Sequence, residues 1–273
     1  MIIDGNKINE EIREELKAKI LQAKIAGKLS LAVVWVGDDP VTAKYVKKKE
    51  EFGKEIGVQV NVYKYGSGIM TSELAEEVRR ILRRDPSGII VQLPLPNNID
   101  SSEILNMIPI NKDVDLLSDR AYQNFVDGKS VVLPPVTGVI KEILERGEVR
   151  DLRGLYAVVV GRGRLVGKPA AAWLVNQGAR VELLGRDTED VSVFTKEADI
   201  IIAGAGVPKL IKPDMVKSGA IIIDAATTEE SGKIVGDVVR EAGDSARIFA
   251  PVPGGVGPMT VAMLFKNLLM LHC

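Results

Sequence analysis

The sequence predicts an α/β protein with two domains, each built on a parallel sheet. Its 273 residues are enough for two hydrophobic cores of ordinary size. Short β-branched runs alternate with segments of helical periodicity along the whole chain, and this alternation is typical of parallel sheets covered by helices. A glycine-rich turn near the middle of the chain joins one expected strand directly to an alanine-rich helix.

Seven short runs rich in Val, Ile and Leu are expected as strands. Three lie in the first half and four in the second: residues 31–36, 58–64, 88–93, 156–160, 180–184, 200–203 and 220–224.

Helices are expected between these strands and at both ends of the chain. The first presents a core face of four apolar residues spaced four apart: Ile8, Ile12, Leu16 and Ile20. Another begins at Pro40, and two more are expected at residues 139–146 and 261–270. Asp100, followed three residues later by Glu103, is typical of a capping box at a helix start. The helix at 139–146 leads into a polar segment, so the border between the domains is expected there, after residue 138.

The charge and hydropathy of the chain exclude several classes of protein. A net charge of −1 provides no basic surface for nucleic acid, so no nucleic-acid partner is expected. The apolar runs are far shorter than the roughly 20 residues of a membrane helix. The first residues lack the basic-then-apolar order of a signal peptide, and a cytoplasmic location is expected.

The chain has one histidine and one cysteine, His272 and Cys273, both at its end. Disulfides, Cys/His zinc sites, Ser-His-Asp triads and cysteine nucleophiles need such residues elsewhere. Proton transfer in an enzyme of this sequence must therefore use Lys, Tyr, Asp or Glu. No paired acidic motif is present, so no metal is expected.

The glycine-rich turn is typical of a dinucleotide-binding loop. We expect Gly161 to form a tight turn, Gly163 to admit a pyrophosphate against the backbone, and Gly167 to allow close packing of strand and helix. The spacing is one residue longer than G-x-G-x-x-G, and a tight turn without a ligand is the alternative interpretation.

Two arginines and an acid bear on the choice of dinucleotide. An acid after the next strand favours NAD, and an arginine favours NADP. The chain has both, as Asp187 and Arg186. We favour NADP, with Arg186 and Arg162 binding the 2′-phosphate and Asp187 turned away or paired with an arginine.

Polar residues in the first half stand at positions suited to a ligand. Tyr45 and Lys49 share one face of the helix that begins at Pro40, but spacing alone does not choose among Lys47, Lys48 and Lys49. Gln92 closes an apolar strand, where open α/β sheets place ligand contacts. A surface lysine face and a satisfied amide are the alternatives.

Five segments occur together in the order and spacing of one family: residues 45–49, 91–96, 112–115, 161–167 and 251–260. The chain resembles the bifunctional methylenetetrahydrofolate dehydrogenase/methenyltetrahydrofolate cyclohydrolases over essentially its whole length. The resemblance implies an N-terminal folate-binding catalytic domain, residues 1–138, and a C-terminal Rossmann-like NADP-binding domain, residues 139–254. It also implies that residues 255–273 pack back on the first domain, and that the protein is a homodimer.

The resemblance also implies roles for individual residues. Lys49 would be the catalytic lysine, Tyr45 would stack beside the folate, Gln92 would contact and tune Lys49, and Asp115 would accept hydrogen bonds from the pterin. Further substrate contacts would come from the closing motif, at Pro253, Gly254 and Gly255. The implied activity is NADP-dependent oxidation of 5,10-methylenetetrahydrofolate, then hydrolysis to 10-formyltetrahydrofolate. A dehydrogenase without the hydrolysis, a Rossmann dehydrogenase for another small substrate, and a non-catalytic NADP-binding protein are the alternatives.

The chain departs from the family pattern at several positions. Leu116 stands where the family usually has glycine, so its backbone must avoid positive φ or accept strain. Gly163 replaces a usual serine, and Gly185 and Arg186 replace a pair usually begun by histidine. Residues 132–138 replace a segment that in the family usually reads Pro-Cys-Thr-Pro-x-Gly, and this removes the thiol of that cysteine and the hydroxyl of that threonine.

Overall fold

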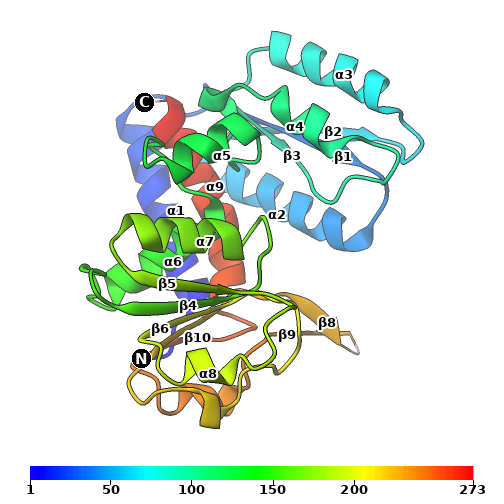
Figure 1. Cartoon of the computed structure of the whole chain (residues 1–273). Coiled ribbons are helices and arrows are strands. Elements are labelled where there is room, and N and C mark those ends of the chain that lie inside the picture. The colour runs from blue at the N-terminus through cyan, green and yellow to red at the C-terminus, as the bar shows by residue number, and fades with distance from the viewer. Residues whose placement is uncertain (231, 273) are drawn as a thin grey trace. The chain divides into compact units, whose positions relative to one another are not determined.

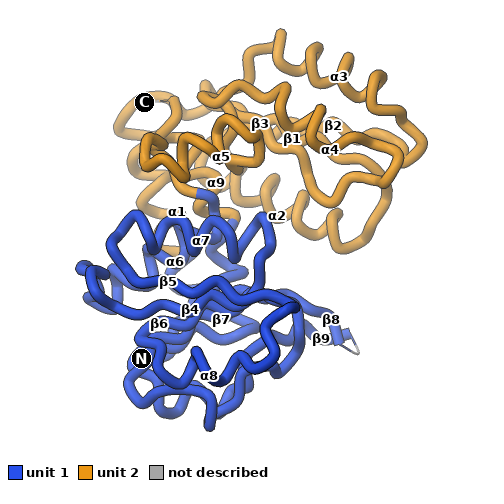
Figure 2. Tube along the Cα trace, viewed as in Figure 1, with its two compact units in different colours: residues 1–9, 134–260 blue, residues 10–133, 261–273 orange. Residues whose placement is uncertain are grey.

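The computed structural model describes residues 1–230 and 232–272 (Figure 1). The chain forms two compact units (Figure 2). Unit 1 comprises Met1–Asn9 and Pro134–Thr260, and unit 2 comprises Glu10–Leu133 and the C-terminal segment from Val261. From the sequence we placed the corresponding borders after residues 138 and 254. The N-terminal segment joins unit 1 because Ile2 pairs with Phe249 in a parallel bridge.

Unit 2 is built on a parallel sheet of three strands with the order β2-β1-β3: Ser30–Val36 (β1), Gln59–Tyr65 (β2) and Gly88–Val91 (β3). On one face lie α3 (Thr71–Arg83) and α4 (Ser101–Asn106) (Figure 1). Their apolar side chains form one core cluster with alternate residues of β1 and β3. Successive side chains of a strand point to opposite faces of the sheet, so only alternate residues of β1 and β3 reach this cluster.

Helix α2 (Pro40–Ile56) packs against β2 and against the last helix, α9 (Val256–His272). The rings of Phe52 and Phe265 stack with centroids 5.1 Å apart. A Cβ on Gly53 would lie 2.4 Å from Val60 Cγ2, so only glycine permits this approach of helix and strand. Unit 2 also contains α5 (Asp119–Val126), a 3₁₀ turn at Ile110–Lys112 and most of α1 (Gly5–Gln22). The expected association of the C-terminal helix with the first domain is confirmed.

Unit 1 is built on a parallel sheet of five strands with the order β10-β7-β6-β4-β5. In that order the strands are Ile248–Ala250, Ile221–Asp224, Ile200–Ala203, Tyr156–Val160 and Arg180–Leu184. Helices α6 (Pro135–Arg146) and α7 (Gly167–Asn176) lie on one side of the sheet, and α8 (Ser192–Thr195) lies on the other (Figure 1). Short 3₁₀ turns at Pro213–Met215 and Arg240–Gly243 complete the second side. The predicted α/β class with parallel sheets is confirmed.

Several elements differ from the expectation. The sequence missed β10 and the antiparallel pair β8 (Thr228–Glu230) and β9 (Lys233–Val235), because three-residue strands carry too little periodicity to detect. Helix α9 begins at Val256 and not at 261, which is compatible with Pro258 because the first turn of a helix does not need that N–H.

The capping box predicted at Asp100 is half correct. Asp100 Oδ1 accepts hydrogen bonds from the backbone N–H groups of Ser102 and Glu103 at 2.9 and 3.0 Å, as an N-cap should. Asp100 N donates to Thr71 Oγ1 at 2.9 Å and not to Glu103. The reciprocal half of the box is therefore wrong, since a residue from another helix already satisfies that donor. No helix in the described part of the chain is long and apolar enough to cross a membrane, and Cys273 lies outside the described residues.

Candidate active site and cofactor pocket

Lys49 is the buried member of the lysine run on α2. Its exposed fraction is 5%, whereas Lys47 and Lys48 are exposed. Lys47 forms an ion pair with Glu51 at 3.7 Å, and the Lys48 ammonium lies 5.6 Å from the Tyr45 ring centroid. The orientation of α2 therefore buries one of the three lysines, Lys49, and leaves the other two exposed.

Gln92 is the hydrogen-bond partner of Lys49. It follows β3 directly, and its backbone N–H extends the ladder by donating to Val34 O at 2.8 Å. Lys49 Nζ donates to Gln92 Oε1 at 2.8 Å, and Gln92 Nε2 donates to Leu93 O at 3.0 Å. The second bond orients the amide so that its oxygen faces the lysine. The contact implied by the family resemblance is present.

Asp115 lies in a tight turn that Asp113 holds together. Leu116 N donates to Asp113 O at 3.3 Å, and the Asp113 carboxylate accepts from the backbone N–H groups of Leu117 and Ser118 at 3.2 and 2.8 Å. Leu116 has φ +54°, so the backbone accepts the strain that a glycine would have avoided. The structural role of Asp113 was not expected from the sequence; the available signal was that the 112–115 motif carries two acids, Asp113 and Asp115.

Lys49 and Asp115 influence each other's ionisation. Burial lowers the pKa of Lys49, and the negative charge of Asp115 opposes that change. Burial raises the pKa of Asp115 to about 6, with Lys49 acting in the opposite direction and Asp113 adding to the rise. An amine whose pKa is lowered, within electrostatic range of a carboxyl group whose pKa is raised to about 6, is suited to proton transfer.

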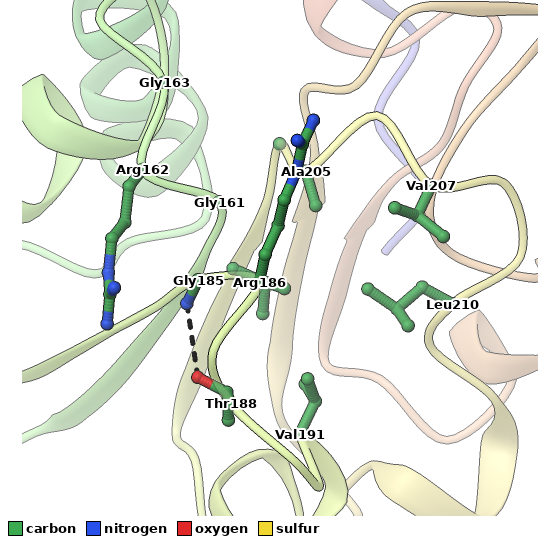
Figure 3. A pocket seen from close by; sticks show the side chains of 12 residues that line it. Gly161, Arg162, Gly163, Gly185, Arg186, Thr188, Val191, Ala205, Val207 and Leu210 are labelled. Carbon is green, nitrogen blue, oxygen red and sulfur yellow. Dashed lines mark hydrogen bonds between the residues drawn. The ribbon is translucent and has the colours of Figure 1, made fainter.

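Unit 1 contains a pocket of about 490 Å³ at the carboxyl ends of its strands (Figure 3). Its lining comes from the turns after β4, β5 and β6: Val160, Gly161, Arg162, Gly163, Gly185, Arg186, Thr188, Val191, Gly204, Ala205, Val207 and Leu210. From the sequence we expected Gly161, Arg162, Gly163 and Arg186 at this site, but neither Gly204 nor the apolar wall, and we gave Thr188 no role of its own. Thr188 Oγ1 accepts from Gly185 N at 3.2 Å and so shapes the turn after β5.

The three glycines of the predicted dinucleotide loop have different surroundings. Gly161 has φ +112°, and a Cβ on it would lie 2.4 Å from Gly204 O. A Cβ on Gly167 would lie 1.7 Å from Gly161 O, so this glycine is required where α7 meets the turn. A Cβ on Gly163 would meet no heavy atom within 4 Å. The loop therefore leaves open space at Gly163, where a pyrophosphate was expected, and the pocket fits a dinucleotide.

Arg162 and Arg186 differ in whether a carboxylate of the described residues pairs with the guanidinium. Arg162 Nη1 donates to Asp187 Oδ1 at 2.6 Å, and Arg162 Nε and Nη2 each lie 3.3 Å from Leu183 O. Its charge is thus largely committed to the protein. Arg186 is exposed, forms no ion pair with any described residue, and lines the pocket (Figure 3). Asp187 pairs with a neighbouring arginine, which is one of the two arrangements expected.

Pro253, Gly254 and Gly255 belong to unit 1, whereas Tyr45, Lys49, Gln92 and Asp115 belong to unit 2. Gly254 has φ +102° and accepts at its carbonyl from Gly5 N at 2.7 Å. Gly255 N donates to Pro251 O at 2.8 Å. The bond from Gly5 ties the closing motif to the N-terminal segment, and the bond from Gly255 closes a turn within the motif. Within residues 1–230 and 232–272, no group of three or more His, Cys, Asp or Glu side chains could hold a metal ion.

Comparisons with known proteins agree with this arrangement of two domains. Residues 3–115 match the catalytic domain of tetrahydrofolate dehydrogenase/cyclohydrolase, and residues 134–273 match its NAD(P)-binding domain. The bifunctional protein FolD of Nautilia profundicola is 41% identical over 271 residues, covering 97% of this chain and 95% of the relative.

Solved structures give the same result. The bifunctional FolD dehydrogenase/cyclohydrolase of Campylobacter jejuni superposes with a TM-score of 0.94 at 38% identity, covering 100% of this chain and 98% of that one. The Trypanosoma brucei FolD, solved with NADP and an inhibitor, has a TM-score of 0.93 at 30% identity and covers 100% and 97%. Matches of this extent confirm the resemblance drawn from five short motifs, and the chain belongs to the tetrahydrofolate dehydrogenase/cyclohydrolase family.

Proposed function

We propose that this protein oxidises 5,10-methylenetetrahydrofolate with NADP and hydrolyses the resulting 5,10-methenyltetrahydrofolate to 10-formyltetrahydrofolate. The observation that carries the proposal is the buried Lys49 ammonium held 2.8 Å from Gln92 Oε1, with Asp115 as its charged neighbour. A protein that only bound a dinucleotide would have no use for a buried lysine, which is costly unless it is paired. The protein is an NADP-dependent enzyme of one-carbon metabolism.

NADP, when bound, supplies the acceptor for a hydride. We assign its pyrophosphate to the loop of Gly161, Gly163 and Gly167, and its 2′-phosphate to Arg186 with a smaller contribution from Arg162. Two observations support these assignments: the open space at Gly163, and the guanidinium of Arg186, which forms no ion pair with a described residue. Arg162 contributes less because Asp187 already accepts from it.

In the oxidation, this chain's residues orient the folate and supply no base. The nitrogen lone pairs of the substrate stabilise the cation that forms, so alignment is the main requirement. We assign the pterin to Asp115, whose carboxylate accepts from its amino edge, and to the ring of Tyr45. Pro253, Gly254 and Gly255 are assigned as further substrate contacts.

In the hydrolysis, proton transfer is needed when water adds to the methenyl carbon and the ring opens. We assign this transfer to Lys49. Its lowered pKa makes the neutral amine accessible, and Gln92 accepts a hydrogen bond from it without adding a charge that would restore the proton.

We further propose a cytoplasmic homodimer. The family resemblance supports this proposal. Light scattering during size-exclusion chromatography should give about twice the 29.5 kDa chain mass, and a mass near 29.5 kDa would contradict the dimer.

The activity is tested by absorbance-monitored turnover of 5,10-methylenetetrahydrofolate with NADP and with NAD, run in parallel with hydrolysis of 5,10-methenyltetrahydrofolate without cofactor. We expect both reactions, with NADP preferred. Oxidation without hydrolysis would leave a monofunctional dehydrogenase. NADP binding with neither reaction would make the chain a binding protein.

A further inference from the structure

Asp237 is a buried carboxylate that the proposed reactions do not use. It follows β9 and has an exposed fraction of 0%. Its Oδ2 accepts from Ala205 N at 2.6 Å and from Gly206 N at 3.1 Å, more than thirty residues earlier in the chain. Ala205 and Val207 line the pocket of unit 1, so this carboxylate holds part of the backbone that forms the pocket wall.

The wall segment, residues 204–207, has a backbone conformation that favours binding of a negatively charged group. Gly206 has φ +71°, and the successive N–H groups of Ala205 and Gly206 converge on a single oxygen. Consecutive backbone N–H groups arranged in this way form a concavity that binds negative charge. Here the protein's own Asp237 occupies that concavity.

A second carboxylate anchors the first. Asp224, at the end of β7, is also 0% exposed and accepts from Val238 N at 2.9 Å and from Ala226 N at 3.1 Å. A Cβ on Gly236 would lie 1.9 Å from Asp224 Oδ2, so a glycine is required for the chain to pass this close. The far side of the same segment is fixed because Ile211 N donates to Asp237 O at 2.9 Å. The chain around Asp237 is thereby attached to β7 of the parallel sheet on one side and to the pocket wall on the other.

We propose that Asp237 is a positioning residue for the cofactor: its carboxylate holds residues 204–207 in the conformation that lines the pocket, and dinucleotide affinity depends on it. The inference rests on the assignment of this pocket to NADP. It predicts a defect confined to cofactor use, because every contact of the Asp237 carboxylate described above lies within unit 1.

The test compares Asp237→Ala and Asp237→Asn with the wild type by equilibrium binding of NADP, by the KM for NADP in the oxidation, and by hydrolysis of 5,10-methenyltetrahydrofolate without cofactor. Loss of hydrogen bonds to a charged acceptor should raise the Kd for NADP about tenfold or more in Asp237→Ala. Asn keeps one acceptor oxygen without the charge, so its Kd should rise about threefold. Hydrolysis should stay within about twofold in both variants, since a positioning effect on unit 1 does not reach it.

Ile222→Val serves as the matched control, because it removes a methyl group from β7 in the core of unit 1 and touches neither carboxylate bond. It should lower the melting temperature and leave the Kd for NADP unchanged. An unchanged Kd in folded Asp237→Ala, or a parallel fall in hydrolysis and oxidation, would overturn the proposal. If Asp237→Ala does not fold, an unchanged Kd in Asp237→Asn overturns it equally. Wild-type protein that fails to bind NADP would instead contradict the assignment of the pocket.

Discussion

Lys49 differs from its lysine neighbours in having its ammonium buried against a neutral amide. Lys49→Met keeps the length and apolar stem of the side chain but removes the proton carrier. We expect methenyltetrahydrofolate hydrolysis to fall about 10²–10⁴-fold, which is typical of a lost general acid–base group. Binding of NADP should be unchanged, and this is measured by equilibrium titration.

Lys47→Met is the matched control, since Lys47 is exposed on the same helix and pairs with Glu51 alone among the contacts described for it. It should hydrolyse the substrate at the wild-type rate. Near-normal hydrolysis by folded Lys49→Met would remove the lysine from the mechanism.

Asp115 leads to a prediction about pH. Burial raises the pKa of Asp115 to about 6, so the carboxylate that accepts from the pterin loses its charge as the pH falls through that value. The kcat/KM for hydrolysis should therefore rise with pH through about 6, by about tenfold for each pH unit on the acid side. Asp115→Asn cannot titrate and should lose this limb of the profile as well as about 1.5–3 kcal/mol of folate binding. An unchanged acid limb in Asp115→Asn, or a sensitive Asp113 beside a tolerant Asp115, would show that the assignment is wrong.

Arg186 and Arg162 lead to a prediction about cofactor choice. Arg186 has no ion-pair partner among the described residues, whereas Asp187 holds Arg162 at 2.6 Å. Arg186→Ala should lower kcat/KM for NADP by about ten- to a hundredfold, in line with about 1.5–3 kcal/mol for a charged hydrogen bond, and leave kcat/KM for NAD nearly unchanged. The measurement is a comparison of both cofactors in both proteins. A wild type that prefers NAD, or an Arg186→Ala variant that keeps its preference for NADP, would contradict the role of Arg186.

The turn between Asp113 and Leu116 gives a prediction at the scale of an element. Leu116 is 2% exposed and has φ +54°, so its side chain is buried by a backbone that disfavours it. Leu116→Ala should cost about 2–5 kcal/mol because it loses the burial and keeps the strain. Leu116→Gly loses the same burial but relieves about 1–2 kcal/mol of left-handed strain. Urea denaturation should therefore show the Gly variant to be more stable than the Ala variant by about 1 kcal/mol. The opposite order would mean that the turn is not left-handed in solution.

The residues assigned to NADP binding lie in unit 1, whereas Lys49 lies in unit 2, and this separation gives a prediction for the whole molecule. A ligand that binds the native state stabilises it by about 2.7 kcal/mol at a hundred times its Kd. NADP at that concentration should raise the melting temperature by about 5 °C or more. Lys49→Met should show the full shift because it leaves unit 1 intact, and Arg186→Ala should show a smaller shift at the same concentration. Calorimetry distinguishes the two; equal shifts in both variants would argue against Arg186 as a cofactor contact.

Features that depend on local pattern were predictable from the residues alone. The strands at 156–160, 180–184 and 200–203 were expected at the positions where β4, β5 and β6 lie. β4 and β6 are continuous apolar runs, as buried parallel strands usually are, whereas β5 alternates charged and apolar residues before it ends in Leu184. Gly161 and Gly167 were recognised because their spacing between strand and helix reflects a steric requirement that glycine alone meets. Five motifs in register were enough to predict the family.

Other features depend on residues distant in the sequence, and no local pattern reports them. Helical spacing alone left Lys49 as one of three lysines, and only the family resemblance singled it out. In the structure the packing of α2 buries Lys49 and brings Gln92, 43 residues later, to its ammonium. Asp187 counted against NADP until its carboxylate was seen to pair with Arg162. Asp237 attracted no notice in the sequence, because its importance lies in two backbone N–H groups more than thirty residues away. Burial and hydrogen bonding between distant segments are set by how the strands and helices pack, and the same packing shifts the pKa values of Lys49 and Asp115.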